Sequence, residues 1–157
     1  MAGNQTILVL GGIILFSYLI LNFNNASITQ LNLSLENEAI ITATAVGQSI
    51  IDEAQSRAFD ENTVSNFVDK VADLSLSLKS DNEVNSTDYD DVDDYNGMKR
   101  TETLGRLGNF DLEVEVYYVN KSTLAKSFAP TFSKRIDVKI KNNYLPNEIK
   151  LSHVVSY

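Results

Sequence analysis

The residues best suited to bind a ligand are acidic and lie close together near the middle of the chain. Carboxylates this close repel one another unless they are solvated or neutralised, and hard oxygen ligands suit Ca²⁺. The spacing is not that of an EF-hand loop, in which the acids alternate ahead of a glycine. The segment therefore predicts either a calcium site of another kind or a solvated acidic turn, and no other cofactor is indicated. The five aspartates are Asp88, Asp90, Asp91, Asp93 and Asp94, in the segment STDYDDVDDYNG.

Other chemistry-bearing residues are scarce. Cysteine is absent and His153 is the single histidine, which removes thiolate metal sites and most histidine-based centres. His153 alternates with Leu151 and Val155, so we expect a half-buried strand residue rather than a catalytic base. The chain has neither a glycine-rich phosphate loop nor the glycine pattern of a nucleophile elbow. The sequence therefore predicts a protein that is not an enzyme.

Charge and length narrow the class further. The chain of 157 residues carries a formal charge of -8, and its lysines and arginines form no cluster. A nucleic-acid interface needs such a cluster, so nucleic acid is not expected as a partner. The length fits one domain with a core of its own, preceded by a separate N-terminal segment.

That N-terminal segment is almost pure hydrocarbon. Residues 7–23 are apolar except at two polar positions and a glycine pair, and no charged residue precedes Glu36. A secretory signal would carry a basic start and a small-residue cleavage site, both of which are missing. Seventeen residues are just enough to span a membrane, and the absence of a polar face argues against a soluble core helix. We expect this helix to be retained and to form lipid or subunit contacts through Ile7, Leu8, Leu10, Gly11, Gly12, Ile14, Leu15, Tyr18, Leu19 and Leu21.

The apolar segment runs into an amphipathic one without a proline or a glycine-rich break. Apolar positions recur at intervals of three and four residues from Leu35 to Ala58, which is the pattern of a helix with one buried face. The pattern favours one long helix from about residue 4 to about residue 57. A second, shorter helix is expected in the segment DENTVSNFVDKVADLSLSL, with an apolar face that contains Val64, Phe67 and Leu74.

Past the acidic loop the periodicity changes from 3.6 to 2. Three segments alternate apolar and polar residues: FDLEVEVYYVN, KRIDVKIKN and NEIKLSHVVSY. Such segments are typical of antiparallel strands with one buried face. The sequence therefore predicts an α+β fold, in which a long N-terminal helix packs against an antiparallel sheet of at least three strands. Its expected parts are residues 1–25, an amphipathic continuation over 26–57, and a head over 58–157 with the acidic loop at 80–98 and the sheet at 110–157.

This order of parts resembles the type IV pilin and type II secretion pseudopilin superfamily over essentially the whole chain. Two short motifs add to the likeness. One is Val46-Gly47-Gln48-Ser49-Ile50-Ile51-Asp52-Glu53 in the helix, and the other is Asp90-Asp91-Val92-Asp93-Asp94-Tyr95-Asn96-Gly97 ahead of the sheet. The sequence departs from the family pattern at Gln5, where an acidic residue is expected, and it has neither a basic leader nor a proline in the apolar helix. We expect either a chain that is already trimmed or a member that is processed differently.

The resemblance implies a function. The apolar helix would hold the subunit in the inner membrane, and an assembly machinery there would then polymerise many copies into a cell-surface filament whose core is made of these helices. An unbroken apolar helix is as well accommodated among copies of itself as in lipid. Two alternatives stay open: a minor pilin or pseudopilin of a secretion or pilus system, and a single-pass anchored extracytoplasmic binding domain with the acidic loop as its ligand site.

Overall fold

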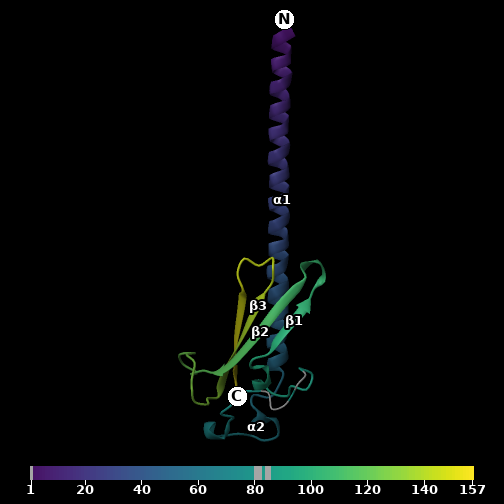
Figure 1. Ribbon diagram of the computed structural model, residues 1–157. Coiled ribbons are helices and arrows are strands. Elements are labelled where there is room, and N and C mark those ends of the chain that lie inside the picture. The colour runs from purple at the N-terminus through teal and green to yellow at the C-terminus, as the bar shows by residue number, and fades with distance from the viewer. Residues whose placement is uncertain (1, 80–82, 84–85) are drawn as a thin grey trace. The chain divides into compact units, whose positions relative to one another are not determined.

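The computed structural model describes residues 2–79, 83 and 86–157 (Figure 1). One α-helix, α1 (Ala2–Gln55), opens the chain and confirms the predicted long helix. The chain divides into two compact units, Met1–Glu38 and Ala39–Tyr157, with the boundary inside α1. The first unit is the apolar part of this helix, and the second contains the rest of the helix and the sheet.

The second unit is built around one antiparallel sheet. Its four strands follow one another in the order β1-β2-β3-β4, and Figure 1 labels the first three. The strands are β1 (Lys99–Thr103), β2 (Asn109–Tyr118), β3 (Ser133–Lys141) and β4 (Ile149–Ser156). The predicted α+β class with an antiparallel C-terminal sheet is confirmed.

Alternation along β2 and β3 fixes the buried face of the sheet. Leu112, Val114 and Val116 are buried, and they lie opposite Ile140, Val138 and Ile136 in the register of the two strands. Residues that alternate along a strand point to the same face, so these side chains form one apolar layer. The intervening residues carry the charges of the outer face.

The final five turns of α1 pack through small side chains. Ala39, Ala43, Ile50 and Ala54 are buried at helical spacing, as the amphipathic pattern predicts. Gly47 lies on the same face, where an added Cβ would come within 2.7 Å of Leu151 Cδ1 and 2.8 Å of Ile140 Cδ1. At Gly47 the helix therefore lies so close to β3 and β4 that no side chain would fit.

The predicted second helix is wrong in extent. Only α2 (Glu61–Val64) is α-helical, followed by the 3-10 turn η1 (Val71–Asp73), and Lys70 between them is extended. Val68 and Leu74 still reach a small core, but from separate turns. The Val68 amide donates to the Tyr157 hydroxyl at 3.1 Å rather than to a helix carbonyl. Burial therefore explains the apolar residues without a continuous helix.

The first strand was not among the three predicted. β1 has the sequence KRTET, which has no apolar residue, and it pairs with β2 from Lys99↔Glu113 to Thr103↔Asn109. Its inward positions are Arg100 and Glu102, which form an ion pair with each other. A polar edge strand carries no hydrophobic alternation, so periodicity alone misses it.

Candidate functional site

The N-terminal unit presents an apolar surface on every side. Each residue from 3 to 34 is exposed, and the helix there is long and apolar enough to cross a membrane. The exposed fraction is 75% at Leu8 and 68% at Ile14. Exposed apolar surface of this extent marks a membrane or protein contact. All ten residues predicted for that contact lie on it.

Some polar side chains of this helix donate to its own backbone. Asn22 Nδ2 donates to the Tyr18 carbonyl at 3.0 Å, and Ser27 Oγ donates to the Phe23 carbonyl at 2.9 Å. Thr29 makes the same kind of bond to the Asn25 carbonyl. Gly11 and Gly12 have open space around them, so a neighbouring helix could approach there.

The five aspartates of the acidic loop separate into different environments. Asp91, Asp93 and Asp94 are buried, whereas Asp88 and Asp90 are exposed. Asp91 Oδ1 accepts from the Asp93 amide at 2.6 Å and from the Asp94 amide at 3.2 Å, which shapes the turn η2 (Asp93–Tyr95). Burial raises the pKa of Asp91 to about 7, and the charge of Asp94 adds to the rise. The loop is thus a folded turn rather than a solvated chain.

Two of these aspartates approach Glu83. One carboxylate oxygen each of Glu83, Asp90 and Asp94 lies within 4.8 Å of the others, a set that could surround a cation. Within this set, a hydrogen bond with Asp94 raises the pKa of Glu83, so the two carboxyls can hold a proton in place of a metal. The predicted calcium site stays a prediction. The geometry groups Glu83 with Asp90 and Asp94 and directs Asp91 and Asp93 elsewhere.

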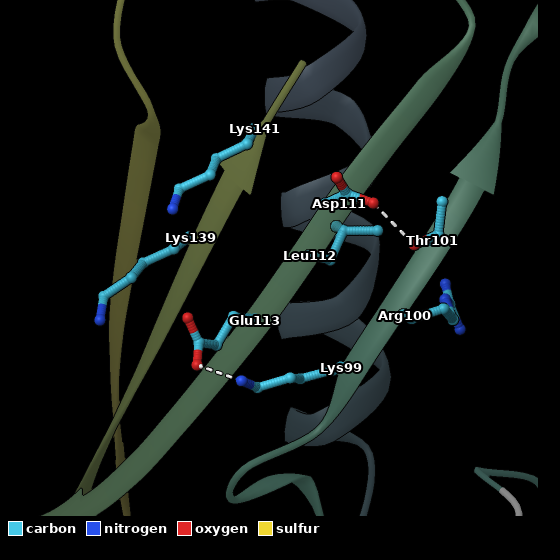
Figure 2. A pocket seen from close by; sticks show the side chains of 8 residues that line it. All are labelled: Lys99, Arg100, Thr101, Asp111, Leu112, Glu113, Lys139 and Lys141. Atoms are coloured by element: carbon cyan, nitrogen blue, oxygen red, sulfur yellow. Dashed lines mark hydrogen bonds and ion pairs between the residues drawn. The ribbon is translucent and has the colours of Figure 1, made fainter.

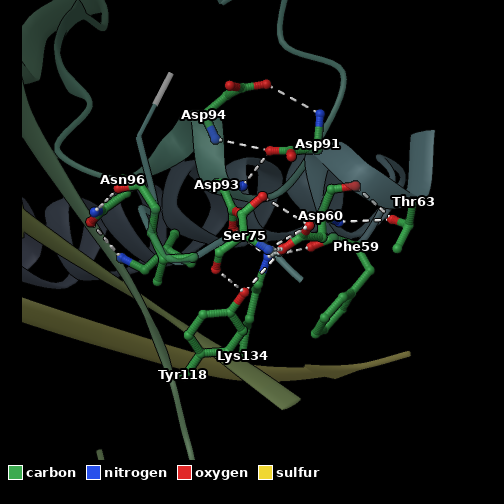
Figure 3. Close-up of polar contacts among 12 residues, drawn as sticks. Phe59, Asp60, Thr63, Ser75, Asp91, Asp93, Asp94, Asn96, Tyr118 and Lys134 are labelled. Atoms are coloured by element: carbon green, nitrogen blue, oxygen red, sulfur yellow. Dashed lines mark hydrogen bonds and ion pairs between the residues drawn. The ribbon is translucent and has the colours of Figure 1, made fainter. Parts of the chain in front are cut away.

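The most unusual polar group of the head is Lys134, whose side chain is wholly buried. Its Nζ donates to the Phe59 carbonyl at 2.7 Å, to Asp60 Oδ2 at 2.9 Å and to Asp93 Oδ1 at 2.5 Å (Figure 3). The Phe59 ring lies 4.5 Å from Nζ and the Tyr118 ring 5.1 Å from it. This arrangement places one amine and two carboxyls in a buried centre between β3, η2 and the start of α2.

Asp60 is the better satisfied of the two carboxyls. Its Oδ2 accepts from the Tyr118 hydroxyl at 2.9 Å, and both oxygens lie 3.1 Å from the Ser75 amide. Burial alone would raise the pKa of Asp60, but the hydrogen bond and charge of Lys134 outweigh it and hold that pKa below its ordinary value. Asp60 also caps α2 by accepting from the Asn62 amide.

Asp93 is less well satisfied. Burial raises its pKa to about 8 in spite of the Lys134 charge. Its Oδ2 is buried and has no hydrogen-bond partner among the described residues. Buried polar atoms without a partner are rare, and they are a reason to look for a chemical role.

Sequence reasoning missed Lys134, Asp60 and Tyr118 as members of a site. A signal for Lys134 was present, because continuing the alternation of Ile140, Val138 and Ile136 by two residues leads to position 134. A lysine at an inward position of a buried strand requires an acidic partner. Nothing in the spacing of the sequence identifies Asp60 as that partner, 74 positions away.

The outer face of the sheet carries a shallow depression of about 380 Å³ over β1, β2 and β3 (Figure 2). Two of its acidic residues have partners within it: Glu113 pairs with Lys99 at 3.2 Å, and Asp111 accepts from the Thr101 hydroxyl at 2.7 Å. Lys139 has no ion-pair partner in the part of the chain that the structure describes. A mixed-charge face of this kind offers contacts to a polar partner rather than a substrate pocket.

His153 lies where the alternation predicts, half-buried on β4 opposite Ile136.

Comparisons with protein-family models, curated proteins and solved structures found no match to this chain. A functional assignment must therefore be argued from the residues and their geometry. Those show a long apolar N-terminal helix joined to a head with an antiparallel sheet, an architecture compatible with a pilin-like subunit.

Proposed function

We propose that this chain is a structural subunit of an extracellular type IV pilus-like filament. The observation that carries the proposal is the N-terminal half of α1, where every residue from 3 to 34 is exposed although most are apolar. A surface of that kind is unstable in water and needs lipid or other protein around it. Lipid would surround it before assembly, and copies of the same helix would surround it afterwards.

The continuity of α1 supports a filament more than a simple anchor. The helix runs without a break from the apolar half into the half that packs on the sheet. In the proposed filament, the core segment would therefore continue into the head without an intervening linker. An anchor needs no such continuity, since a flexible linker would serve it equally well.

Charge supports contacts between heads. Residues 1–98 contain fifteen Asp and Glu against three Lys and Arg, whereas residues 99–157 contain ten Lys and Arg against six Asp and Glu. An open helical polymer needs two different, complementary surfaces on each subunit. Opposite charge on the two parts of the sequence supplies one such complementarity, and it steers association. In this proposal the partners are other copies of the chain and the membrane machinery that assembles them, and the chain has no catalytic activity.

Electron microscopy of material sheared from cells that make the chain tests the proposal. We expect filaments that contain it, and we expect Ile14→Asp to abolish them while Ile14→Val, the matched control, retains them. Recovery of the wild-type chain only as a detergent-solubilised monomer would contradict the filament and favour an anchored domain. A short structure at the cell surface with few copies would favour the minor-pilin alternative.

A further inference from the structure

The buried contact between Lys134 and Asp93 holds an amine and a carboxyl against each other. Nζ lies 2.5 Å from Oδ1, and the two side chains are 0% and 3% exposed. Groups fixed in contact reach effective concentrations far above those in solution, because their encounter has no further entropic cost. Water is kept out, so water does not compete for the carboxyl carbon.

Attack requires the uncharged forms of both groups. An ammonium beside a carboxylate becomes an amine beside a carboxylic acid when one proton crosses from Nζ to the carboxyl. The two atoms that would exchange this proton, Nζ and Oδ1, are 2.5 Å apart. The other carboxyl oxygen, Oδ2, is buried and accepts no hydrogen bond from the described residues. A neutral amine is a nucleophile, and a carboxylic acid, unlike a carboxylate, can accept its attack.

Asp60 is placed to carry the protons. Its Oδ2 lies 2.9 Å from Nζ, and the Tyr118 hydroxyl and the Ser75 amide hold it in position. Its carboxylate oxygen therefore faces the nitrogen from which a proton must leave. The centre thus contains an amine with two carboxyls, an electrophile and a base, each within hydrogen-bond reach of its nitrogen (Figure 3).

We propose that Lys134 and Asp93 form an intramolecular amide bond between Nζ and Cγ. Nζ attacks Cγ, and the carbon-nitrogen bond forms as the carbonyl bond opens to a tetrahedral intermediate. Asp60 takes a proton from the nitrogen and gives it to the departing hydroxyl of Asp93. The carbon-oxygen bond breaks, one water leaves, and Asp60 is again ionised. No oxidant, reductant or external reactant is needed.

The bond would close the chain between the turn η2 and strand β3, across 41 positions. That loop contains β1 and β2 entire, so the middle of the sheet would be held covalently at one end. The inference concerns the head alone and does not depend on polymerisation. Its failure would leave the filament proposal untouched, and failure to form filaments would leave this proposal untouched.

Mass spectrometry of the denatured full-length chain, purified in detergent, tests the bond. We expect a mass lower than that of the sequence by one water, together with a branched tryptic peptide that joins Asp93 to Lys134. The full sequence mass with normal tryptic cleavage after Lys134 would overturn the proposal, leaving an ordinary buried ion pair. Lys134→Met separates the bond from water loss at other aspartates, because only the bond requires the lysine.

Two isosteric variants keep the test independent of folding. Asp93→Asn should form the same bond with ammonia as the leaving group, so its product should have the same mass as the cross-linked wild type. Asp60→Asn retains the shape of the centre and removes the base, so cross-linking should slow at least tenfold in a variant whose circular dichroism is unchanged. Cross-linking of folded Asp60→Asn at the wild-type rate would remove Asp60 from the mechanism.

Discussion

The two halves of α1 have the same backbone conformation but differ in burial: the first half is exposed on all sides, and the second half has one buried face. Before Glu38 the helix exposes leucine, isoleucine and phenylalanine on all sides, and after it one face of small residues is buried in the head. Large side chains all round suit a surface whose neighbours are lipid or other copies. Alanine and glycine on one face suit a helix that must lie close to a sheet. One continuous helix can therefore carry two kinds of surface, because the sizes of the side chains differ between its halves.

The largest expected difference between the two halves of α1 should follow from placing a charged residue in the first half. Ile14→Asp places a carboxylate in the apolar surface, at a cost of about 2.5–3.5 kcal/mol for membrane insertion. We expect loss of filaments and of membrane-bound chain, measured by microscopy and by membrane fractionation. Ser122→Asp, in an exposed loop of the head, is the control for added charge. Equal loss in both variants would break the distinction between the halves.

Removal of Lys134 should affect the head and spare the first half of the helix. Lys134→Ala leaves Asp60 and Asp93 buried without their cation, and we expect the free energy of unfolding to fall by about 3–5 kcal/mol. Urea unfolding in detergent, followed by tyrosine fluorescence, measures this change. Lys139→Ala on the same strand but the outer face is the matched control, with an expected change below about 0.5 kcal/mol.

Glycine substitutions sharpen the comparison within α1 itself. Gly47→Leu forces a side chain toward Leu151 and Ile140, so we expect the head to lose about 1–3 kcal/mol of stability through overpacking. Gly12→Leu meets open space and gains helix propensity, so the stability of the head should not change. Thermal unfolding of both variants in detergent tests the contrast. Equal midpoints would show that the head does not hold the helix closely at Gly47.

The acidic turn should make the stability of the head depend on pH. The unfolded chain loses the Asp91 proton near its ordinary pKa of 3.8, whereas the folded chain keeps it up to about 7. The folded state binds more protons at Asp91 in that window, so the contribution of Asp91 to stability should fall as pH rises from 4 to 7 and then level off. Asp91→Asn keeps the acceptor oxygen without the charge, and it should be more stable than wild type at pH 8 by roughly 1–2 kcal/mol. Urea unfolding at pH 5 and pH 8 gives both values, and parallel profiles would contradict the prediction.

The smallest expected effect concerns calcium. If calcium binds at the set that the structure groups, Glu83, Asp90 and Asp94, added Ca²⁺ should raise the midpoint of thermal unfolding by a few degrees over that in chelator. Asp90→Asn should abolish the difference, whereas Asp88→Asn, outside the set, should retain it. Equal midpoints of the wild-type chain with calcium and with chelator would remove the metal site.

The sequence predicted the elements that have a strong period of their own. The long helix followed from its uninterrupted pattern, and β2, β3 and β4 followed from their alternation. β1 was missed because its inward residues are an arginine and a glutamate rather than apolar residues. The second helix was overextended because Val68 and Leu74 share a helical spacing but are buried separately. Local pattern failed where tertiary contacts decided the conformation.

The candidate sites were predicted less completely, for a related reason. The apolar surface of α1 can be read from composition, since no packing is needed to define it. The acidic loop was recognised, but its division between Asp90 on the surface and Asp93 in the core depends on Lys134 of a distant strand. Residues 60, 93 and 134 are too far apart in the sequence for a local motif to identify the site that they form.

The self-bonded polar side chains of α1 bear on how the subunit changes solvent. Asn22, Ser27 and Thr29 each donate one hydrogen bond to a carbonyl of their own helix, so these three donors need no partner in water, lipid headgroups or a neighbouring chain. In the assembly that we propose, transfer of the helix from bilayer to filament core would leave these three hydrogen bonds intact. These groups would then add no barrier to the transfer.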